Sequence, residues 1–165
     1  MKGRTNEDYK KYYKILEEIG LGYYGIVYKG IEKETNELRA IKVISLEKIK
    51  EINMNEYLCN EINEVDEHIQ LYIKGFIKEY ENMNICSKNN INSVKCYEYF
   101  INDDYFVIIM ELCDTDLFYL LAKKENGFNE KEIFEILNQL NNTFKIMKEN
   151  NIIHRDLKLE NILIK

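Results

Sequence analysis

Alternating apolar and polar residues predict five β-strands in this chain. The two-residue period runs through residues 15–32 on both sides of a glycine cluster, which predicts two strands joined by a tight turn. A third strand is predicted over LRAIKVISL, after the turn ETNE. Two further strands, SVKCYEYF and YFVIIMEL, flank the turn INDD. All of these strands lie in the first two thirds of the chain.

Helical spacing appears between and after the strands. Phe76, Tyr80 and Met83 recur at i, i+4 and i+7, which predicts a helix over YIKGFIKEYENMNIC, and DTDLFYLLAKK predicts a short one. The strongest helix is expected at 129–148, where Asn129 is an N-cap candidate and Glu132 completes a capping box. Its apolar face is formed by Phe134, Leu137, Leu140, Phe144 and Met147. Strands followed by helices indicate an α+β fold.

Composition narrows the class of protein. The 165 residues carry a net charge of −6, which argues against nucleic acid or an anionic membrane as a partner. The longest apolar run, FVIIMELC, is too short to span a bilayer, and the N-terminus lacks a signal-peptide pattern. Four cysteines without a C-x-x-C pair favour reduced thiols. We expect a cytoplasmic protein, with the nucleus as the alternative.

The glycine cluster is Gly20-x-Gly22-x-x-Gly25-x-Val27. Taken alone, it fits a dinucleotide fingerprint, a flap over phosphates or a flexible hairpin. A dinucleotide site needs a helix after the glycines, whereas here an alternating strand follows. Glycines let backbone N–H groups approach an anion closely, so the phosphate flap is favoured.

A lysine interrupts the third predicted strand in the sequence Ala40-Ile41-Lys42. Such a lysine often extends from a strand edge into solvent. In a strand that follows a glycine flap, it can instead reach the α- and β-phosphates of a nucleotide. That role requires a carboxylate to hold the ammonium group, and Glu61, Glu79 and Glu81 are the candidates downstream.

A cluster of polar residues, His154-Arg155-Asp156-Leu157-Lys158-x-x-Asn161, follows the strongest helix. It can be a plain polar loop. Its spacing favours chemistry, because Asp156 can accept a hydroxyl proton, Lys158 can neutralise a γ-phosphate, and Asn161 can bind Mg²⁺.

Together and in this order, the three motifs resemble the protein kinase family over about residues 16–165. The resemblance implies a twisted five-stranded antiparallel sheet with one helix, followed by the first helices and the catalytic loop of a helical lobe. It also implies an N-terminal extension at 1–14, a small lobe at 15–113 with an insertion at about 47–70, a hinge at 111–114, and an incomplete large lobe at 114–165.

The resemblance also implies ATP and Mg²⁺ as cofactors and a protein substrate, and it assigns roles to individual residues. Lys158 resembles the pattern of Ser/Thr kinases rather than that of tyrosine kinases. The implied flap is Gly20, Gly22 and Gly25 with Tyr24 at its tip; the adenine pocket is Ile19, Val27, Ala40, gatekeeper Met110, the Glu111 carbonyl, the Cys113 N–H and Leu163; the catalytic groups are Lys42, Asp156 and Lys158; and the metal ligand is Asn161.

The choice of carboxylate for Lys42 depends on where extra residues are inserted. Glu61 has the spacing common in the family, but it would leave a long connection to the strand at Val94. Insertion before the helix is better tolerated, because that segment is solvated. We therefore predict Glu79 as the partner. The resemblance places Met83, Cys96 and His154 in an apolar stack that aligns the two lobes.

The sequence departs from the family pattern in that no D-F-G follows Leu163 before the last residue, Lys165. We expect these 165 residues to bind ATP but to transfer phosphate poorly, because Asn161 alone is a weak Mg²⁺ ligand. The apolar face of helix 129–148 is expected to recruit a partner or to aggregate. The alternative hypothesis is an ATP-binding decoy or interaction module without catalysis.

Overall fold

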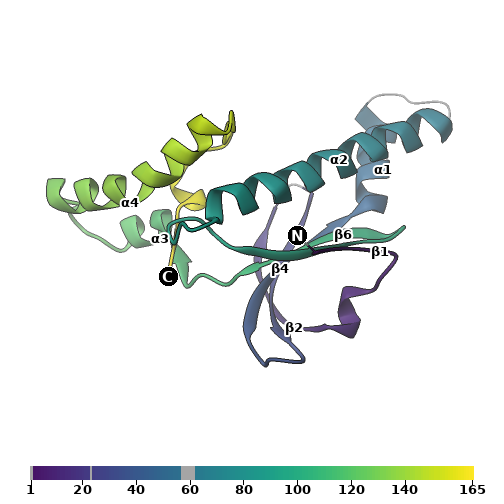
Figure 1. The fold of residues 1–165 in the computed structure, drawn as a ribbon, viewed down its shortest axis with the longest axis horizontal. Helices are drawn as coiled ribbons and strands as arrows, with labels where there is room; N and C mark the ends of the chain where they lie inside the picture. Colours follow the sequence, from purple (N-terminus) through teal and green to yellow (C-terminus); the bar gives the residue numbers. More distant parts are fainter. Residues whose placement is uncertain (1, 23, 57–61) are drawn as a thin grey trace. The chain divides into compact units, whose positions relative to one another are not determined.

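The computed structural model describes residues 2–22, 24–56 and 62–165 (Figure 1). The first two thirds of the chain contain the long strands, with two helices between β4 and β5, and helices dominate the rest. The elements are β1 Lys2–Thr5, the 3-10 helix η1 Tyr9–Lys11, β2 Tyr13–Leu21, β3 Gly25–Glu32, β4 Leu38–Ser45, α1 Leu46–Glu56, α2 Ile62–Ser87, β5 Cys96–Ile101, β6 Tyr105–Glu111, β7 Thr115–Asp116, α3 Leu117–Ala122, α4 Glu130–Glu149, the 3-10 helix η2 Leu159–Asn161 and β8 Leu163–Ile164.

The main sheet has six strands in the order β1-β5-β6-β4-β3-β2. The five strands predicted from the alternation are β2 to β6, and neighbouring strands among them are antiparallel. The sixth strand, β1, was not predicted. It lies at the edge and pairs in parallel with β5, from Lys2 opposite Glu98 to Thr5 opposite Ile101. Because KGRT is short and polar, its strand geometry depends on this distant partner rather than on a local pattern.

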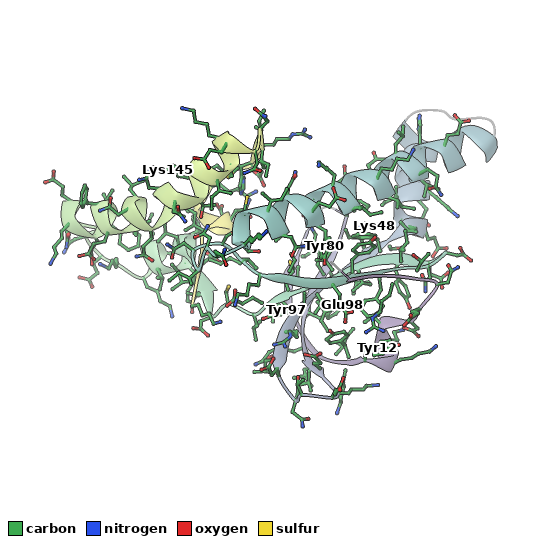
Figure 2. All side chains as sticks on the ribbon, viewed as in Figure 1. Tyr12, Lys48, Tyr80, Tyr97, Glu98 and Lys145 are labelled. Atoms are coloured by element: carbon green, nitrogen blue, oxygen red, sulfur yellow. The ribbon has the colours of Figure 1, made fainter. Side chains whose placement is uncertain are left out.

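Strand β6 forms the centre of this sheet and is covered on both faces. Phe106, Val107, Ile108 and Ile109 are fully buried, which explains why β6 is a continuous apolar run rather than an alternating one. Helix α2 covers one face, where the Tyr80 ring meets the Tyr99 ring edge-on at 5.0 Å between centroids. Figure 2 labels Tyr80 on this helix.

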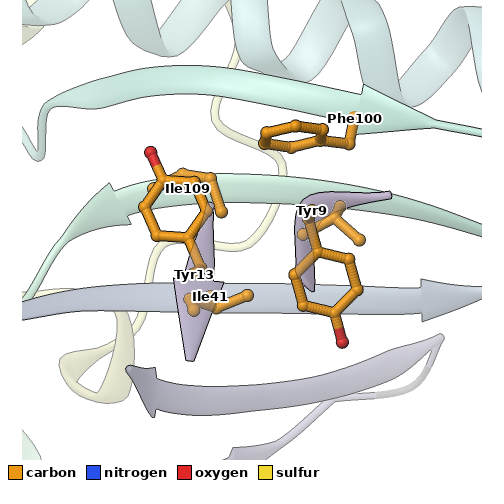
Figure 3. Packing of buried hydrophobic residues seen from close by; sticks show 6 residues of the cluster. Tyr9, Tyr13, Ile41, Phe100 and Ile109 are labelled. Atoms are coloured by element: carbon orange, nitrogen blue, oxygen red, sulfur yellow. The ribbon is translucent and has the colours of Figure 1, made fainter. Parts of the chain in front are cut away.

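The N-terminal segment covers the other face. Tyr9 and Tyr13 are each 3% exposed and pack with Ile41, Phe100 and Ile109 (Figure 3). These three rings and two aliphatic side chains therefore leave water together, and each contributes about 1.5–3 kcal/mol of burial free energy. The residues predicted as an extension thus form part of the core of the small lobe.

A buried carboxylate fixes the N-terminal segment to β5. Glu98 is 6% exposed and accepts hydrogen bonds from Arg4 Nε and from the Tyr13 hydroxyl, both at 2.8 Å. The hydrogen bond to Glu98 raises the pKa of Arg4, while burial and the same carboxylate raise the pKa of Tyr13. A charge removed from water is tolerated when partners of this kind satisfy it.

The segment predicted as an insertion at 47–70 is helical wherever the structure describes it. Helix α1 occupies Leu46–Glu56, and α2 begins at Ile62, ten residues before the predicted start of its helix at Tyr72. The apolar stripe explains the earlier start, since Ile69 and Ile73 are buried in register with Phe76. The asparagine-rich composition of residues 47–70 makes this stripe difficult to recognise in the sequence. Glu61 lies outside the described residues.

The chain divides into two units, which are described separately. The first comprises residues 1–81 and 96–112, and the second comprises residues 82–95 and 113–165. Within the second unit, the buried Asn90 side chain donates hydrogen bonds to the Cys86 carbonyl and to Thr143 Oγ1, each at 2.9 Å. The loop after α2 is therefore tied to α4. Among the described residues, no helix is long and apolar enough to cross a membrane.

Candidate active site

The glycine cluster forms the turn of the β2–β3 hairpin. The Gly22 N–H donates to the Gly25 carbonyl at 2.8 Å, which closes the turn. A side chain at Gly25 would collide with the carbonyl oxygen of Val43 on β4, so the close approach of two backbones requires glycine there. The flap predicted from the G-x-G-x-x-G spacing is thus a hairpin turn followed by a strand.

Strand register places the predicted nucleotide-binding residues of this unit on one face of the sheet. Val27 lies directly opposite Lys42, and Ala40 lies opposite Met110 on the other side of β4. Opposed residues in antiparallel strands project from the same face, and residues two apart share that face. Val27, Ala40, Lys42 and Met110 therefore lie on one surface, while Ile19 is 47% exposed on β2.

An ion pair joins β4 to α2. Lys42 Nζ lies 2.9 Å from Glu79 Oε1, and the two side chains are 28% and 45% exposed. Of the two candidate carboxylates that the structure describes, Glu79 and Glu81, Glu79 is thus the one that pairs with Lys42. Glu81 lies instead 3.5 Å from Lys78 on the same helix. The stripe of buried residues explains why Glu79 is the partner of Lys42, because it determines which side of α2 faces the sheet.

Cys96 on β5 lies beside this ion pair. The thiol is buried and lies outside any disulfide, and burial together with the negative charge of Glu79 raises its pKa to about 12, against the opposing effect of Lys42. A thiol with this pKa stays protonated at neutral pH and behaves as a small apolar group. Cys96 therefore contributes packing rather than reactivity. Its neighbour in the predicted stack, Met83, belongs to the second unit, as does the exposed His154.

The longer part of the second unit, residues 113–165, begins at the predicted hinge. Glu111 ends β6, and Cys113 is half-exposed and lies outside any disulfide. The Asp114 N–H donates to the Ile164 carbonyl, and the Leu117 N–H donates to the Ile162 carbonyl, both at 2.8 Å. These bonds pair β7 with β8.

Leu163, the predicted floor of the adenine pocket, is consequently fixed beside the chain that leaves the hinge, since it lies opposite Asp116 in the β7–β8 ladder.

Two predicted catalytic residues and the predicted metal ligand meet in the loop after α4. Lys158 Nζ lies 2.9 Å from Asp156 Oδ2, and Asn161 Nδ2 donates to the same oxygen at 3.0 Å and to the Asp156 carbonyl at 2.8 Å. Hydrogen bonds from Lys158 and then Asn161 lower the pKa of Asp156, and Asp156 raises the pKa of Lys158. The carboxylate is therefore ionised and the lysine charged throughout the neutral range.

Backbone geometry makes this arrangement possible. Helix α4 ends where Asn151 takes a left-handed φ of 54° and the Ile152 N–H donates to the Met147 carbonyl at 2.8 Å. Arg155, directly before Asp156, has φ of 67°, an uncommon value for a residue with a side chain. Strain of this kind is typical of functional loops, where the surrounding structure enforces it.

A divalent cation bound at this loop would need oxygen ligands. Because Asn161 uses its amide nitrogen toward Asp156, its amide oxygen is the atom suited to a metal. In the described part of the chain, no group of three or more His, Cys, Asp or Glu side chains is arranged to hold a metal ion. The site therefore fits Mg²⁺ that arrives with phosphate oxygens, and does not fit Mg²⁺ held by protein ligands alone.

Comparison with known proteins shows the family to which this chain belongs. A family model for the protein kinase domain matches residues 13–165. This chain belongs to the protein kinase family. The kinase fold explains why a glycine hairpin, a lysine–glutamate pair and an Asp-x-Lys-x-x-Asn loop occur in one chain in this order.

Several curated kinases are similar to this one over nearly all of its length. Calcium-dependent protein kinase 5 of Plasmodium berghei is 32% identical over 160 residues, covering 96% of this chain and 24% of that protein. Human NUAK family SNF1-like kinase 1 is 32% identical and covers 94% of this chain and 20% of that protein. Serine/threonine-protein kinase dst2 of Dictyostelium discoideum is 29% identical, and the match covers 96% of this chain and 12% of that protein. The kinase chain thus spans a quarter or less of these relatives.

Proposed function

We propose that this kinase chain binds ATP through both of its units and belongs to an enzyme that phosphorylates protein Ser or Thr hydroxyls. The observation that carries the proposal is the Lys42–Glu79 ion pair, which holds an ammonium group on the sheet face shared with Val27 and Ala40. An amine positioned by a carboxylate is suited to binding the phosphates of a nucleotide. Lys158 and the names of the relatives support Ser/Thr specificity.

In this proposal, each charged residue has one task. Lys42 binds the α- and β-phosphates beneath the flap, and Glu79 keeps its ammonium group in place. Asp156, ionised at neutral pH, accepts a hydrogen bond from the substrate hydroxyl and so orients it for attack. Lys158 offsets charge that develops on the transferred phosphate. Adenine is bound by Met110, Leu163 and the backbone of Glu111 and Cys113.

When ATP is bound, Mg²⁺ would offset the negative charge of the phosphates. Asn161 is its proposed protein ligand, through the amide oxygen that does not contact Asp156. Because a single neutral amide binds Mg²⁺ weakly, we propose that residues 1–165 taken alone bind ATP and transfer phosphate slowly. Incubation with radiolabelled ATP, Mg²⁺ and a basic protein substrate tests this, and rapid turnover would contradict it.

A second candidate function is an ATP-binding interaction module without catalysis. It is favoured by the apolar face of α4, on which Phe134 is 64% exposed and Leu137 is 55% exposed. Exposed aromatic and aliphatic residues in a row are typical of a surface that a partner covers. If this face binds protein, light scattering is expected to detect self-association. The double variant Phe134→Ser, Leu137→Ser is expected to abolish it. We place either form of the protein in the cytoplasm or nucleus.

Nucleotide titration tests the proposed function. Residues 1–165 are titrated with ATP that carries a fluorescent N-methylanthraniloyl group, in the presence of Mg²⁺. Lys42→Met is expected to weaken binding about ten- to a hundredfold, because a charged hydrogen bond to phosphate contributes about 1.5–3 kcal/mol.

Lys78→Met is the matched control, since Lys78 also pairs with a glutamate but on the outer side of α2. Equal affinities of wild type and Lys42→Met would contradict the proposal.

A further inference from the structure

An unbroken series of aromatic contacts connects α2 with the centre of the sheet. The Phe76 ring lies 5.5 Å from Phe106 on β6, which stacks on Tyr99 of β5 at 5.4 Å, and Tyr99 meets Tyr80 of α2. Phe76 and Tyr80 are 7% and 1% exposed. Aromatic pairs at these separations stabilise the packing beyond the effect of burial alone. Helix α2 is therefore held in one rotational setting on the sheet.

The flap contacts this series through Tyr24. Its ring lies 5.7 Å from Tyr72 and 6.0 Å from Phe76, and both contacts are T-shaped. Tyr24 lies between Gly22 and Gly25, at the turn of the hairpin. The tip of the flap thus rests on a helix that is distant in sequence. This contact adds to the strand pairing of the hairpin, which reaches Leu21 opposite Ile26 and Gly25 opposite Ile44.

The same helix face carries the ion pair. Phe76 and Glu79 are three residues apart, so their side chains are neighbours on α2. A surface pocket of about 340 Å³ lies between the flap tip and the helix, and it is lined by Tyr24, Leu71, Tyr72, Gly75, Phe76 and Glu79. The Tyr24 ring and the carboxylate that holds Lys42 therefore border one space. A rotation of α2 would displace both contacts at once.

We propose that Tyr24 is a positioning residue that couples the glycine flap to α2, so that the flap and the Lys42–Glu79 pair bind nucleotide as one unit. The inference rests on the proposed ATP binding. Tyr24 acts through Tyr72 and Phe76 rather than through a bond to the reacting atoms. With the ring in place, the flap N–H groups are already gathered over the phosphate site when the nucleotide arrives, and less ordering is required on binding.

The test is titration of residues 1–165 with the fluorescent ATP analogue and Mg²⁺. Tyr24→Ala is expected to weaken binding about three- to tenfold, the affinity equivalent of one or two aromatic contacts. Tyr24→Phe keeps the ring and is expected to stay within about twofold of wild type. Leu16→Ala is the matched control, because Leu16 is on β2 of the same hairpin, lies outside the flap and is 44% exposed.

A double-mutant cycle separates coupling from a general loss of stability. Tyr72→Ala is expected to weaken binding about as much as Tyr24→Ala, and the double variant no more than either one. The inference is overturned if the losses of affinity in the two single variants add in the double variant. It is also overturned if Tyr24→Phe binds the ATP analogue as weakly as Tyr24→Ala does, or if Tyr24→Ala binds it more tightly than wild type. A wild-type chain that binds no nucleotide would instead refute the proposed function itself, and the inference with it.

Discussion

At the scale of single residues, the site depends on charges that are paired but remain accessible to solvent. Lys42, Asp156 and Lys158 each lie within 3 Å of an oppositely charged group, and Asp156 is 64% exposed at its side chain. Exposed pairs contribute little to stability. Their function is to hold protonation states and side-chain directions, and it is therefore best tested through ionisation rather than unfolding.

Replacement of Lys158 is predicted to raise the pKa of Asp156 toward the ordinary value for a carboxylic acid. The Lys158 ammonium is the largest cause that lowers this pKa, so its removal by Lys158→Met leaves the Asn161 hydrogen bond and the smaller effect of His154. Titration of the carboxylate carbons by ¹³C NMR measures the midpoint directly. In wild type, the pair's small stabilising effect is present above the ordinary pKa of about 3.9 and is lost as the pH falls below it.

Lys131→Met serves as the control for that titration, because Lys131 is 85% exposed and lies 3.9 Å from Glu135 on α4. It should leave the Asp156 midpoint unchanged. An Asp156 midpoint that does not move in Lys158→Met would show that the two side chains are not paired in solution.

At the scale of elements, a feature is predictable from the sequence when its hydrogen-bonding partners lie within a few residues of each other. The capping box of α4 is formed as predicted, with the Asn129 side chain accepting from the Glu132 N–H and the Glu132 carboxylate accepting from the Asn129 N–H. The strands were also predicted from local patterns, such as the alternation on both sides of the glycine cluster for β2 and β3 and the apolar run of β6.

Elements that depend on distant partners were not predictable in this way. Strand β1 is polar and exists through its parallel pairing with β5. The Tyr24 ring meets α2 across nearly fifty positions of sequence, and no periodicity reports such a contact. The pairing of Lys42 with Glu79 was predictable only by combining the apolar stripe of α2 with the family's pattern.

Substitution of Gly75 by alanine is predicted to stabilise the protein by about 0.5–1 kcal/mol. Gly75 lies inside α2, where glycine is unfavourable, and an added Cβ would meet no atom within 4 Å. Urea unfolding followed by circular dichroism measures the change.

The comparison variant is Gly30→Ala on β3, whose Cβ would press against the Lys14 carbonyl and the Ile41 side chain, and which should destabilise the protein. A loss of stability in Gly75→Ala would contradict the described position of this residue in the helix.

At the scale of the whole molecule, the residues proposed to bind one nucleotide are divided between two units. Lys42, Glu79 and the flap belong to the first, and Asp156, Lys158, Asn161 and Leu163 belong to the second. Membership of the kinase family makes a shared nucleotide the expected arrangement. The approach of Lys42 and Asp156 to the same triphosphate is a prediction of this account, and it is the claim on which the proposed function depends.

The most direct test uses an ATP analogue whose terminal phosphate carries an acyl group that transfers to nearby lysine amines. Mass spectrometry of labelled peptides is predicted to find Lys42 and Lys158 acylated, with both reactions suppressed by excess ATP, while the exposed Lys78 and Lys131 are not protected. Labelling of Lys42 and Lys158 at the rate of those surface lysines, or protection of only one of the pair, would contradict a single nucleotide site built from both units.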